Sequence, residues 1–402
     1  MKQGFFKPTE IQTPETAISK IPKCGVCKLY KHCKSPKMKP TGEGKRKILI
    51  VAEAPGATED EKGVQLIGQS GKYLEDTLRK CGIEMRKDCW LTNAIICRPA
   101  ENRTPDDKEI DYCRPNLFNT IEELKPEIII PLGGTAVKSL IGGLWKDKVD
   151  AISRWVGWRI PVQKINTWVC PTYHPAFLLR GKDPVTEMYF TQHLKDAVSL
   201  PSRPWRNGPP DWKSRIKVLF DPLQAAGSIR ELSKHNPMIA FDYETNCLKP
   251  DNSTAKIISC SVHFDIGKGI TIAFPWRDPV IDEVSHLLMN PKIKKIGSNI
   301  KFEERWTRAV LGHGVKGWHW DTMLAAHVLD NRTGITGLKF QAFVQLGQDS
   351  YDDHIKPFLY SGGSYKLNKI NQLDMQEVLV YNGLDSLLEF KVYHKQARLL
   401  GV

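Results

Sequence analysis

Short apolar segments alternate with amphipathic ones along the first half of the chain, and this alternation is the strongest constraint on its fold. Buried strands are predicted at 48–51, 127–132 and 168–170, and each apolar run ends close to Gly or Pro. Amphipathic segments at 71–80 and 106–124 have the spacing of helices between these strands. Strands that alternate with helices form a parallel sheet with helices packed on its faces. We therefore expect an N-terminal α/β/α domain with a parallel sheet.

A proline-rich segment separates this region from the rest of the chain. Residues 201–216 contain four prolines and an Asn-Gly pair without apolar periodicity, which indicates a linker. A chain of 402 residues has room for two domains with their own cores, and we expect them at 1–200 and 217–402. Three strands and two helices are predicted after the linker, at 238–241, 256–262, 270–274, 322–329 and 375–394.

The charge is concentrated near the N-terminus. The 58 Lys and Arg exceed the 45 Asp and Glu by 13, and residues 1–50 alone hold 12 basic and three acidic residues. This concentration favours a polyanionic partner, nucleic acid first, and a solvated basic tail is the alternative. The sequence has no apolar run of about 18 residues and no N-terminal apolar segment followed by a cleavage site. It therefore predicts no membrane span and no secretory signal, and we expect a cytoplasmic protein.

Four cysteines have the pattern of a metal centre. Cys24 and Cys27 form a Cys-x-x-Cys pair, in which two thiolates can share one ion. A zinc ion would take its other ligands from nearby, at positions 32–33. An iron–sulfur cluster can recruit distant cysteines, and Cys97 and Cys113 lie in polar segments suited to this role. Four unligated thiols are the third possibility.

Residues 20–180 resemble the family 4 uracil-DNA glycosylases, which carry a four-iron, four-sulfur (4Fe-4S) cluster. The matching motifs are short but follow the family's order and spacing: 52–56, 58–60, 68–71, 91–93, 97–99, 102–105, 113–115, 132–134 and 173–176. The resemblance implies that the cluster is bound by Cys24, Cys27, Cys97 and Cys113, which leaves Cys33 spare.

This resemblance also implies a pocket for an extruded uracil. Breaking the glycosidic bond releases a uracilate anion, whose negative charge has to be stabilised. The amide of Asn93 can both donate to and accept from the uracil edge, and His174 can donate a hydrogen bond to the leaving oxygen. Glu53 and the turn at 55–56 are expected to form the remaining wall.

Two positions depart from the glycosylase pattern. The family has Gly where this chain has Ala52, and it presents a Phe for stacking on uracil where this chain has Leu66. Base–aromatic stacking is worth roughly 1–3 kcal/mol, so Leu66 predicts reduced glycosylase activity. A module that holds DNA without catalysis is the alternative for this domain.

Acidic residues in the second half suggest a second site. Asp242 and Glu244 lie two apart on a predicted strand and so share one face, while Tyr381 and Asp385 lie four apart on one helix face. Carboxylates without His or Cys suit Mg²⁺ or Mn²⁺. Two such ions clamp the attacking and leaving oxygens during phosphodiester hydrolysis. For an isolated acidic pair, a solvated strand end is the alternative.

Three further motifs, at 297–303, 321–325 and 337–339, make residues 236–400 resemble the proofreading 3′–5′ exonuclease domain of family A DNA polymerases. The resemblance implies a ribonuclease H-like fold with a mixed sheet and two divalent metal ions, Mg²⁺ or Mn²⁺. The metal ligands would be Asp242, Glu244, Glu303 and Asp385. Tyr381 would orient the attacking water. Asn299 and Lys301 would contact DNA. The family has Asp where this chain has Glu303, and the extra methylene shifts that carboxylate.

Together the two halves resemble the front part of certain bacteriophage A-type DNA polymerases, which would place the protein in the cytoplasm of a bacterial host. Three functions remain open: a metal-dependent 3′–5′ exonuclease with an attached uracil-recognition domain, a bifunctional repair enzyme, and a non-catalytic module. Because few residues follow Asp385, we expect any polymerase to be a separate subunit. DNA is the expected partner in each case, and its phosphates are expected to contact four lysines around the first cysteine pair: Lys28, Lys31, Lys34 and Lys37.

Overall fold

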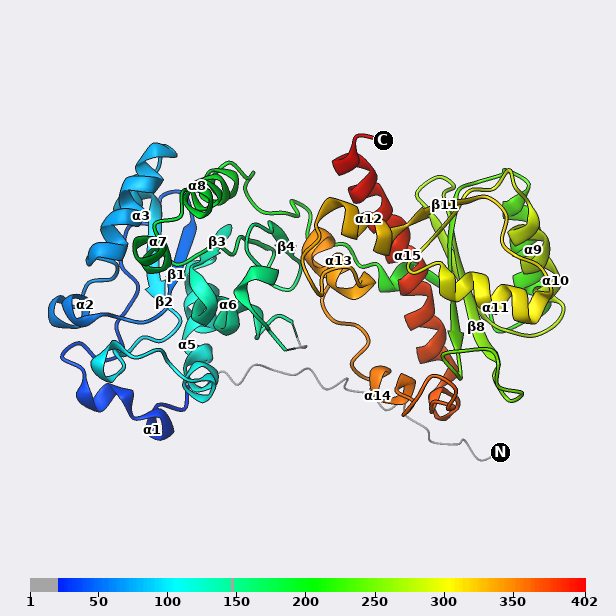
Figure 1. The fold of residues 1–402 in the computed structure, drawn as a ribbon, viewed down its shortest axis with the longest axis horizontal. Helices are drawn as coiled ribbons and strands as arrows, with labels where there is room; N and C mark the ends of the chain where they lie inside the picture. The colour runs from blue at the N-terminus through cyan, green and yellow to red at the C-terminus, as the bar shows by residue number, and fades with distance from the viewer. Residues whose placement is uncertain (1–20, 146–147) are drawn as a thin grey trace, which may run out of the picture. The chain divides into compact units, whose positions relative to one another are not determined.

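The computed structural model describes residues 21–145 and 148–402, which fall into two compact units (Figure 1). One unit comprises the chain up to residue 149 together with 171–200, and the other comprises 150–170 together with 201–402. The domain boundaries at 1–200 and 217–402 stay predictions, and residues 1–20 of the first domain lie outside the described residues.

The first sheet contains the three strands expected from the apolar runs. Its strand order is β2-β1-β3-β5-β4, with β2 at Cys89–Asn93, β1 at Ile48–Ala52, β3 at Ile128–Pro131, β5 at Thr167–Val169 and β4 at Ile160–Val162. Strand β1 runs parallel to β2 and β3, as predicted. Strand β4 runs antiparallel to β5, so the sheet is mixed rather than parallel throughout. The reason is the short connection between β4 and β5, because only antiparallel strands can be joined by a tight turn.

Helices of the first unit form two groups. Helix α3 contacts both α7 and α8, and α5 packs against α6; in Figure 1 these two groups flank the strands. The helices of this unit are α1 (Cys24–Cys27), α2 (Ala57–Lys62), α3 (Gln69–Lys80), α4 (Met85–Asp88), α5 (Asp107–Leu124), α6 (Gly133–Ile141), α7 (Pro175–Gly181) and α8 (Pro184–Val198). Helix α5 begins with a capping box, in which the Asp106 and Glu109 side chains each accept a hydrogen bond from the other's backbone N–H.

The second sheet is mixed, as expected. Its strand order is β11-β10-β7-β8-β9-β6, and β8 runs antiparallel to both of its neighbours, while β10 and β11 continue parallel to β7. This is a ribonuclease H-like arrangement. The strands are β6 (Ile216–Val218), β7 (Ile239–Thr245), β8 (Ile257–Phe264), β9 (Ile270–Pro275), β10 (Lys295–Gly297) and β11 (Trp318–Asp321).

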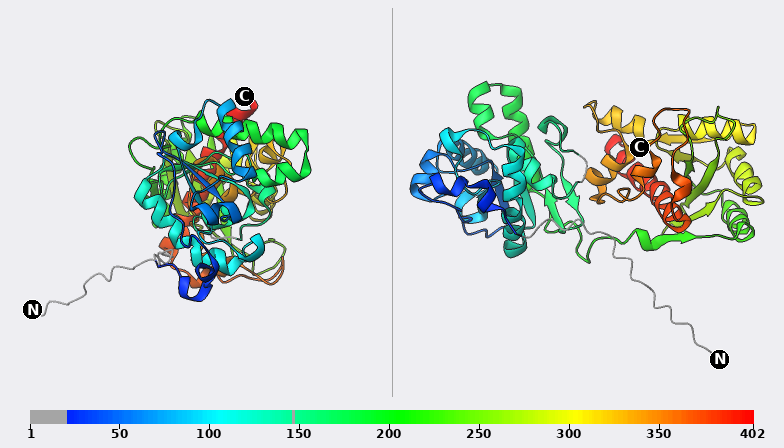
Figure 2. Two further views of the ribbon diagram at one scale, coloured as in Figure 1. Left: turned by 90° about the vertical axis from the view of Figure 1, so that its left-hand side faces the viewer. Right: turned by 90° about the horizontal axis from the view of Figure 1, so that it is seen from below.

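One long helix crosses this sheet. Helix α15 (Met375–Leu400) contacts strands β6 to β10 and packs against α13; Figure 1 shows it along its length, and part of it is seen in orange-red in Figure 2. It extends beyond the predicted end at 394, whereas α12 has the predicted bounds. The other helices of this unit are α9 (Pro222–Ser233), α10 (Val280–Met289), α11 (Lys301–Leu311), α12 (Thr322–Leu329), α13 (Leu338–Leu346) and α14 (Lys356–Leu359).

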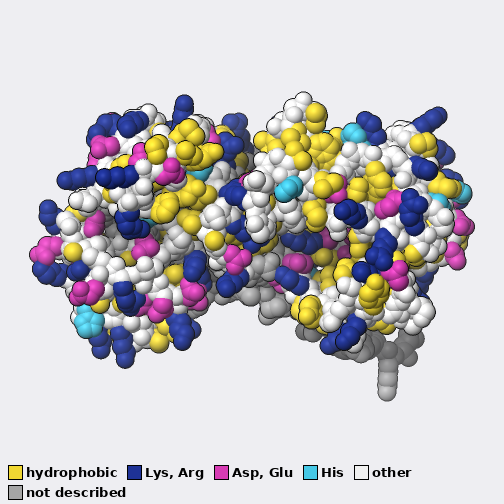
Figure 3. Space-filling view, in the orientation of Figure 1, with side chains coloured by type: hydrophobic (Ala, Val, Ile, Leu, Met, Phe, Trp, Pro, Cys, Tyr) yellow, Lys and Arg dark blue, Asp and Glu magenta, His cyan; other side chains and the backbone are white. Residues whose placement is uncertain are grey.

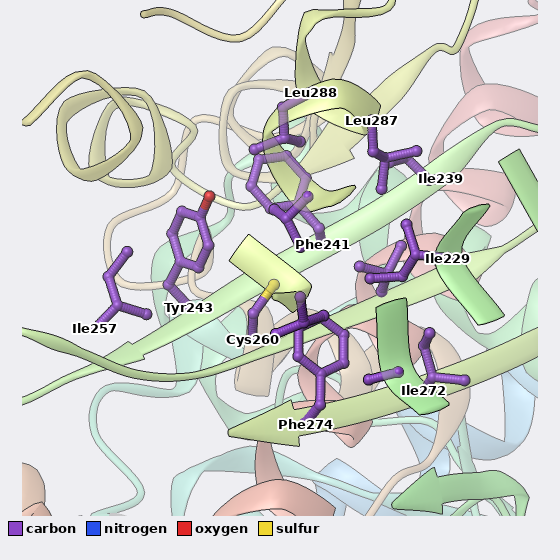
Figure 4. Close-up of a cluster of buried hydrophobic side chains, with 14 of the residues drawn as sticks. Ile229, Ile239, Phe241, Tyr243, Ile257, Cys260, Ile272, Phe274, Leu287 and Leu288 are labelled. Carbon is purple, nitrogen blue, oxygen red and sulfur yellow. The ribbon is translucent and has the colours of Figure 1, made fainter. Parts of the chain in front are cut away.

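The alternation of side chains along β7 separates the core from the acidic residues. Phe241 and Tyr243 are buried in the main hydrophobic cluster of this unit, with Leu288 of α10 and Cys260 of β8 (Figure 4). Because successive side chains of a strand point to opposite faces, the residues on either side of Tyr243 face the side that α15 covers. Burial of the aromatic residues therefore fixes which way the acidic ones point.

No helix among the described residues is long and apolar enough to span a membrane.

Candidate active sites

Three predicted metal ligands meet in the second unit. Asp242 and Glu244 come from β7 and Asp385 comes from α15, and their carboxylate oxygens lie within 4.8 Å of one another. Asp242 is partly exposed, whereas Glu244 and Asp385 are buried. The structure thus brings together acidic residues that lie more than a hundred positions apart in the sequence.

The environment of these carboxylates disfavours their ionised forms in the absence of a cation. Burial, followed by the charge of Asp385, raises the pKa of Asp242 well above its usual value. Burial, followed by the charge of Asp242, does the same to the pKa of Glu244. The Asn382 amide donates to Asp242 Oδ2 at 2.6 Å and to the Asp242 carbonyl at 3.2 Å. A set of converging oxygen ligands with excess negative charge fits divalent cations such as Mg²⁺ or Mn²⁺.

Glu303 lies near this group but outside it. It stands in the first turn of α11, is 2% exposed, and has no hydrogen-bond partner for Oε2 among the described residues. Burial, then the charge of Asp242, raises its pKa. Glu303 is not among the three residues whose carboxylate oxygens lie within 4.8 Å of one another, so its role as a ligand stays a prediction.

Glu389 is an acidic neighbour that the sequence analysis missed. It lies one helical turn after Asp385 on α15, is 1% exposed, and its Oε2 also has no partner within the described part of the chain. Burial raises its pKa, followed by the charges of Asp242 and Glu303. Its spacing of four from Asp385 was the available signal, but a Glu in a long helix is usually solvated.

Tyr381 is buried one turn before Asp385, and burial raises its pKa above the usual value. Two residues from outside the predicted set, Lys339 and Tyr351, contact Asp385 directly. Nothing in the sequence connected Tyr351 to the acidic motifs. The position of Lys339 was noted only as part of a matching motif.

Asn299 and Lys301 are exposed at the start of α11, where a DNA strand can reach them. Asn299 has a φ of +63°, and its N–H donates to Asp321 Oδ1 at 3.0 Å. The same Asp321 oxygen accepts from the Met323 N–H at 2.9 Å at the start of α12. Asp321 therefore fixes the turn that presents Asn299. Contact of Asn299 and Lys301 with DNA stays a prediction.

The predicted glycosylase residues lie at the carboxyl ends of the parallel strands in the first sheet. Asn93 is the last residue of β2 and pairs with Ala52 at the end of β1, directly before Glu53. Glu53 Oε2 accepts a hydrogen bond from Thr135 Oγ1 at 2.8 Å, and the Glu53 charge acts on the titration of His174. Because parallel strands end at the same edge of a sheet, residues distant in sequence share this edge.

The surroundings of His174 favour one neutral tautomer. Its Nδ1 accepts a hydrogen bond from the Ala176 N–H at 3.1 Å, which places the ring hydrogen on Nε2. Burial lowers its pKa, so the ring is neutral over a wider pH range. Gly133, with a φ of +83°, leaves room for the ring, because a Cβ there would lie 2.8 Å from His174 Cβ. His174 thus presents an N–H donor, as the chemistry of uracil release requires.

A buried glutamine holds the predicted base-reading amide. The Asn93 side-chain N–H₂ donates to Gln65 Oε1, and Gln65 Nε2 donates to the Lys39 carbonyl at 3.3 Å. The next residue, Leu66, has a φ of +53°, and the Arg86 guanidinium donates to the carbonyls of Gln65 and Leu66 at 2.8 and 2.7 Å. The loop that replaces the family's Phe with Leu66 is therefore firmly held. Sequence analysis missed Gln65, because a glutamine before an apolar residue carries no spacing signal.

Four cysteines line one cavity. Its lining includes Cys24, Cys27, Cys97 and Cys113, and its other walls include Leu29, Tyr30, Ile95 and Ile96. Burial raises the pKa of Cys97 to about 12, and it raises the pKa of Cys27 and Cys113 as well.

Hydrogen-bond donors face two of these sulfurs. The Lys37 N–H donates to Cys97 Sγ at 3.3 Å, and the Asn116 amide donates to Cys113 Sγ at 3.5 Å. Cys33 does not line the cavity; its Sγ donates to the Leu29 carbonyl at 3.3 Å. Four convergent sulfurs in an apolar cavity with N–H donors are a donor set that fits an iron–sulfur cluster.

The four predicted DNA-contacting lysines are exposed near this cavity. Lys34 is paired with Glu61, and the Lys37 ammonium lies 5.4 Å from the centre of the Tyr30 ring. Lys28 and Lys31 are the other two. On the face that Figure 3 shows, basic and acidic side chains are interspersed. Contact of these lysines with DNA stays a prediction.

The first unit therefore gathers the predicted glycosylase residues at one edge of its sheet, and the second gathers a cluster of carboxylates. A family model of the uracil DNA glycosylase superfamily matches residues 40–198, and a model of 3′–5′ exonucleases matches residues 217–400. The type-4 uracil-DNA glycosylase of Pyrobaculum aerophilum is 39% identical over 163 residues, which cover 40% of this chain and 81% of that protein.

A relative that spans both units is a DNA polymerase of Bacillus phage SP01. It is 27% identical over 362 residues, which cover 82% of this chain and 38% of the polymerase. The solved structure of Escherichia coli RNase D matches 45% of this chain and 44% of its own length at 13% identity, with a TM-score of 0.35.

The two family models and the two relatives matched by sequence confirm the family resemblances drawn from the sequence. The chain belongs to the uracil-DNA glycosylase superfamily in its N-terminal part, with type-4 relatives, and this part is joined to a 3′–5′ exonuclease domain of the DNA polymerase A kind. It is a DNA-processing protein with a nuclease domain. The type-4 relatives imply an iron–sulfur centre, and the exonuclease family implies divalent metal ions.

Mn²⁺ is expected to stabilise the protein more at about pH 8 than at about pH 5.5. The pKa values of Asp242 and Glu244 are raised in the folded state, so the stabilisation from their protonated forms is present at low pH and is lost as pH rises through those values. A cation replaces the lost protons and restores stability. Thermal melts of the wild type and of Asp242→Asn, with and without Mn²⁺, measure this effect. Equal shifts at both pH values, or in both proteins, would contradict it.

Proposed function

We propose that the C-terminal domain is a two-metal 3′–5′ exodeoxyribonuclease. The observation that carries the proposal is the convergence of Asp242, Glu244 and Asp385 within 4.8 Å, in a fold of the exonuclease family. Oxygen ligands from both a strand and a helix, with no His or Cys, suit a pair of Mg²⁺ or Mn²⁺ ions. When bound, these ions supply charge to the attacking and leaving oxygens of a phosphodiester.

The residues of the chain have separate tasks in this reaction. Asp242, Glu244 and Asp385 would hold the ions, with Glu303 completing the set. Tyr381, one turn before Asp385, would orient the attacking water through its hydroxyl. Burial raises the Tyr381 pKa, so this hydroxyl keeps its proton and donates a hydrogen bond.

We propose that the N-terminal domain binds a 4Fe-4S cluster through Cys24, Cys27, Cys97 and Cys113. These residues come from α1, from the loop after β2 and from α5, so the cluster would join three segments that are distant in sequence. The segment that follows Cys27 carries the exposed lysines, and the cluster would hold it in place against DNA phosphates. A separate polymerase subunit is the further partner that we propose.

A second candidate function is excision of uracil by the N-terminal domain. The observation that favours it is the neutral His174 with its hydrogen on Nε2, close enough to Glu53 to feel its charge. Leu66 lowers the expected rate, because it offers no aromatic face to the base. In the absence of excision, the same pocket would hold DNA for the exonuclease.

Single-stranded DNA labelled at its 5′ end is expected to shorten from its 3′ end in the presence of Mg²⁺ or Mn²⁺. Asp242→Ala should reduce the rate by about a hundredfold or more, because one of the carboxylates that would hold the ions is lost. The matched control is Asp282→Ala, which removes an exposed carboxylate on α10. Absence of shortening by the wild type across a range of metals would leave only a non-catalytic DNA-binding role.

Uracil release, assayed as alkali-labile breaks at a single uracil, should be weak in the wild type. Leu66→Phe is expected to increase it by about tenfold, because an aromatic ring restores base stacking. His174→Ala should abolish it in both backgrounds. If neither the wild type nor Leu66→Phe releases uracil, the pocket has a binding role only.

The purified protein is expected to be brown and to contain about four irons per chain. Cys97→Ser should lose the cluster, whereas Cys33→Ser should keep it, because Cys33 lies outside the cavity. Iron analysis and the visible absorption spectrum measure both outcomes. One zinc per chain without iron would contradict the assignment.

A further inference from the structure

A lysine lies inside the acidic site of the second unit. Lys339 stands in the first turn of α13, and its Nζ forms an ion pair with Asp385 Oδ1 and donates to the Tyr351 hydroxyl at 2.8 Å. Its ammonium also lies 4.5 Å from the centre of the Tyr381 ring and 4.3 Å from that of Tyr351. One cation therefore contacts a predicted metal ligand and the predicted water-orienting tyrosine.

The hydrogen bonds to the Asp385 carboxylate fall on one of its two oxygens. Lys339 Nζ and the Tyr351 hydroxyl both donate to Oδ1. The other oxygen, Oδ2, accepts no hydrogen bond from the described residues and would be available to an ion. Groups that hydrogen-bond a metal ligand in this way fix its orientation, and their loss typically costs tenfold to a hundredfold in metal affinity or activity.

The place of Lys339 in its helix is unfavourable for stability alone. A cation in the first turn of a helix meets the positive end of the helix dipole. The side chain is also largely buried, with 26% of its surface exposed, and Asp385 is 8% exposed. Desolvation offsets much of the attraction in a buried ion pair, so such a pair adds little net stability. A role in the site accounts for a lysine at this position better than a role in folding.

We propose that Lys339, with Tyr351, is a positioning residue of the exonuclease reaction. It turns one oxygen of Asp385 toward the metal position and holds the ring of Tyr381 so that the tyrosine hydroxyl is aimed at the water. This inference rests on the proposed two-metal nuclease. It predicts that removal of the lysine lowers turnover of DNA, whereas Mn²⁺ binds at least as tightly as in the wild type.

Those opposite effects follow from charge and geometry. Lys339 is a positive charge beside an ion position, so its removal leaves the site more negative and Mn²⁺ binds at least as tightly. The freed Asp385 and Tyr381 no longer hold the reacting groups, so turnover falls. Damage to the fold would instead lower both the Mn²⁺ affinity and the turnover.

The test compares Lys339→Met, Lys339→Arg and Tyr351→Phe with the wild type and with Lys316→Met, a matched change at an exposed lysine of the same unit. Mn²⁺ affinity is measured by calorimetry, and kcat and KM are measured on single-stranded DNA. Lys339→Met should lower kcat by about 10- to 100-fold. The KM for DNA should stay unchanged, and the affinity for Mn²⁺ should not fall. Lys339→Arg should restore part of the kcat, and Lys316→Met should match the wild type.

Wild-type kcat in Lys339→Met overturns the proposal, and so does a parallel loss of Mn²⁺ affinity and kcat in a folded variant. If Lys339→Met does not fold, Tyr351→Phe decides: it keeps the ring and removes one donor to Asp385, and an unchanged kcat overturns the proposal. Failure of the two-metal function itself is distinguishable, because the wild type would then not shorten DNA at all.

Discussion

The repulsion between carboxylates gathered in one partly buried place is the constraint on which the second unit depends. Asp242, Glu244 and Asp385 converge, and Glu303 and Glu389 add buried oxygens that have no hydrogen-bond partner among the described residues. A protein that concentrates negative charge in this way has to supply protons or cations. The fold supplies a cation of its own, Lys339, and the proposed divalent ions would supply the others.

The geometry of this site follows from the hydrophobic core. Strand β7 buries Phe241 and Tyr243 on one face, and the period of two then directs Asp242 and Glu244 to the other face. Helix α15 covers that face and brings Asp385. In the first unit the arrangement of the strands also positions the site residues. Its parallel strands bring Glu53 and Asn93 to one edge of the sheet, and His174 lies at the same edge.

Much of both sites could be predicted from local sequence. The spacing of Asp242 and Glu244 fixes a shared strand face, and the four cysteines that line one cavity were all named beforehand. Gln65 and Tyr351 could not be found in this way, because each gains its significance from a hydrogen bond to a residue far along the chain. Glu389 has the helical spacing from Asp385, but only its burial distinguishes it from a solvated Glu. The antiparallel β4–β5 hairpin was also missed, since an apolar run predicts a strand but not its direction.

The sequence by itself determined the two families, the alternation of strands and helices, and the residue types available for metal, cluster and base. These depend on local spacing, because the periods of a strand and of a helix decide which side chains lie on the same face. Only the tertiary structure decided which oxygen of Asp385 is held by Lys339 and Tyr351. It also decided which tautomer His174 adopts and that Gln65 holds Asn93. Hydrogen bonds between distant segments exist only after the core has packed, and no local pattern encodes them.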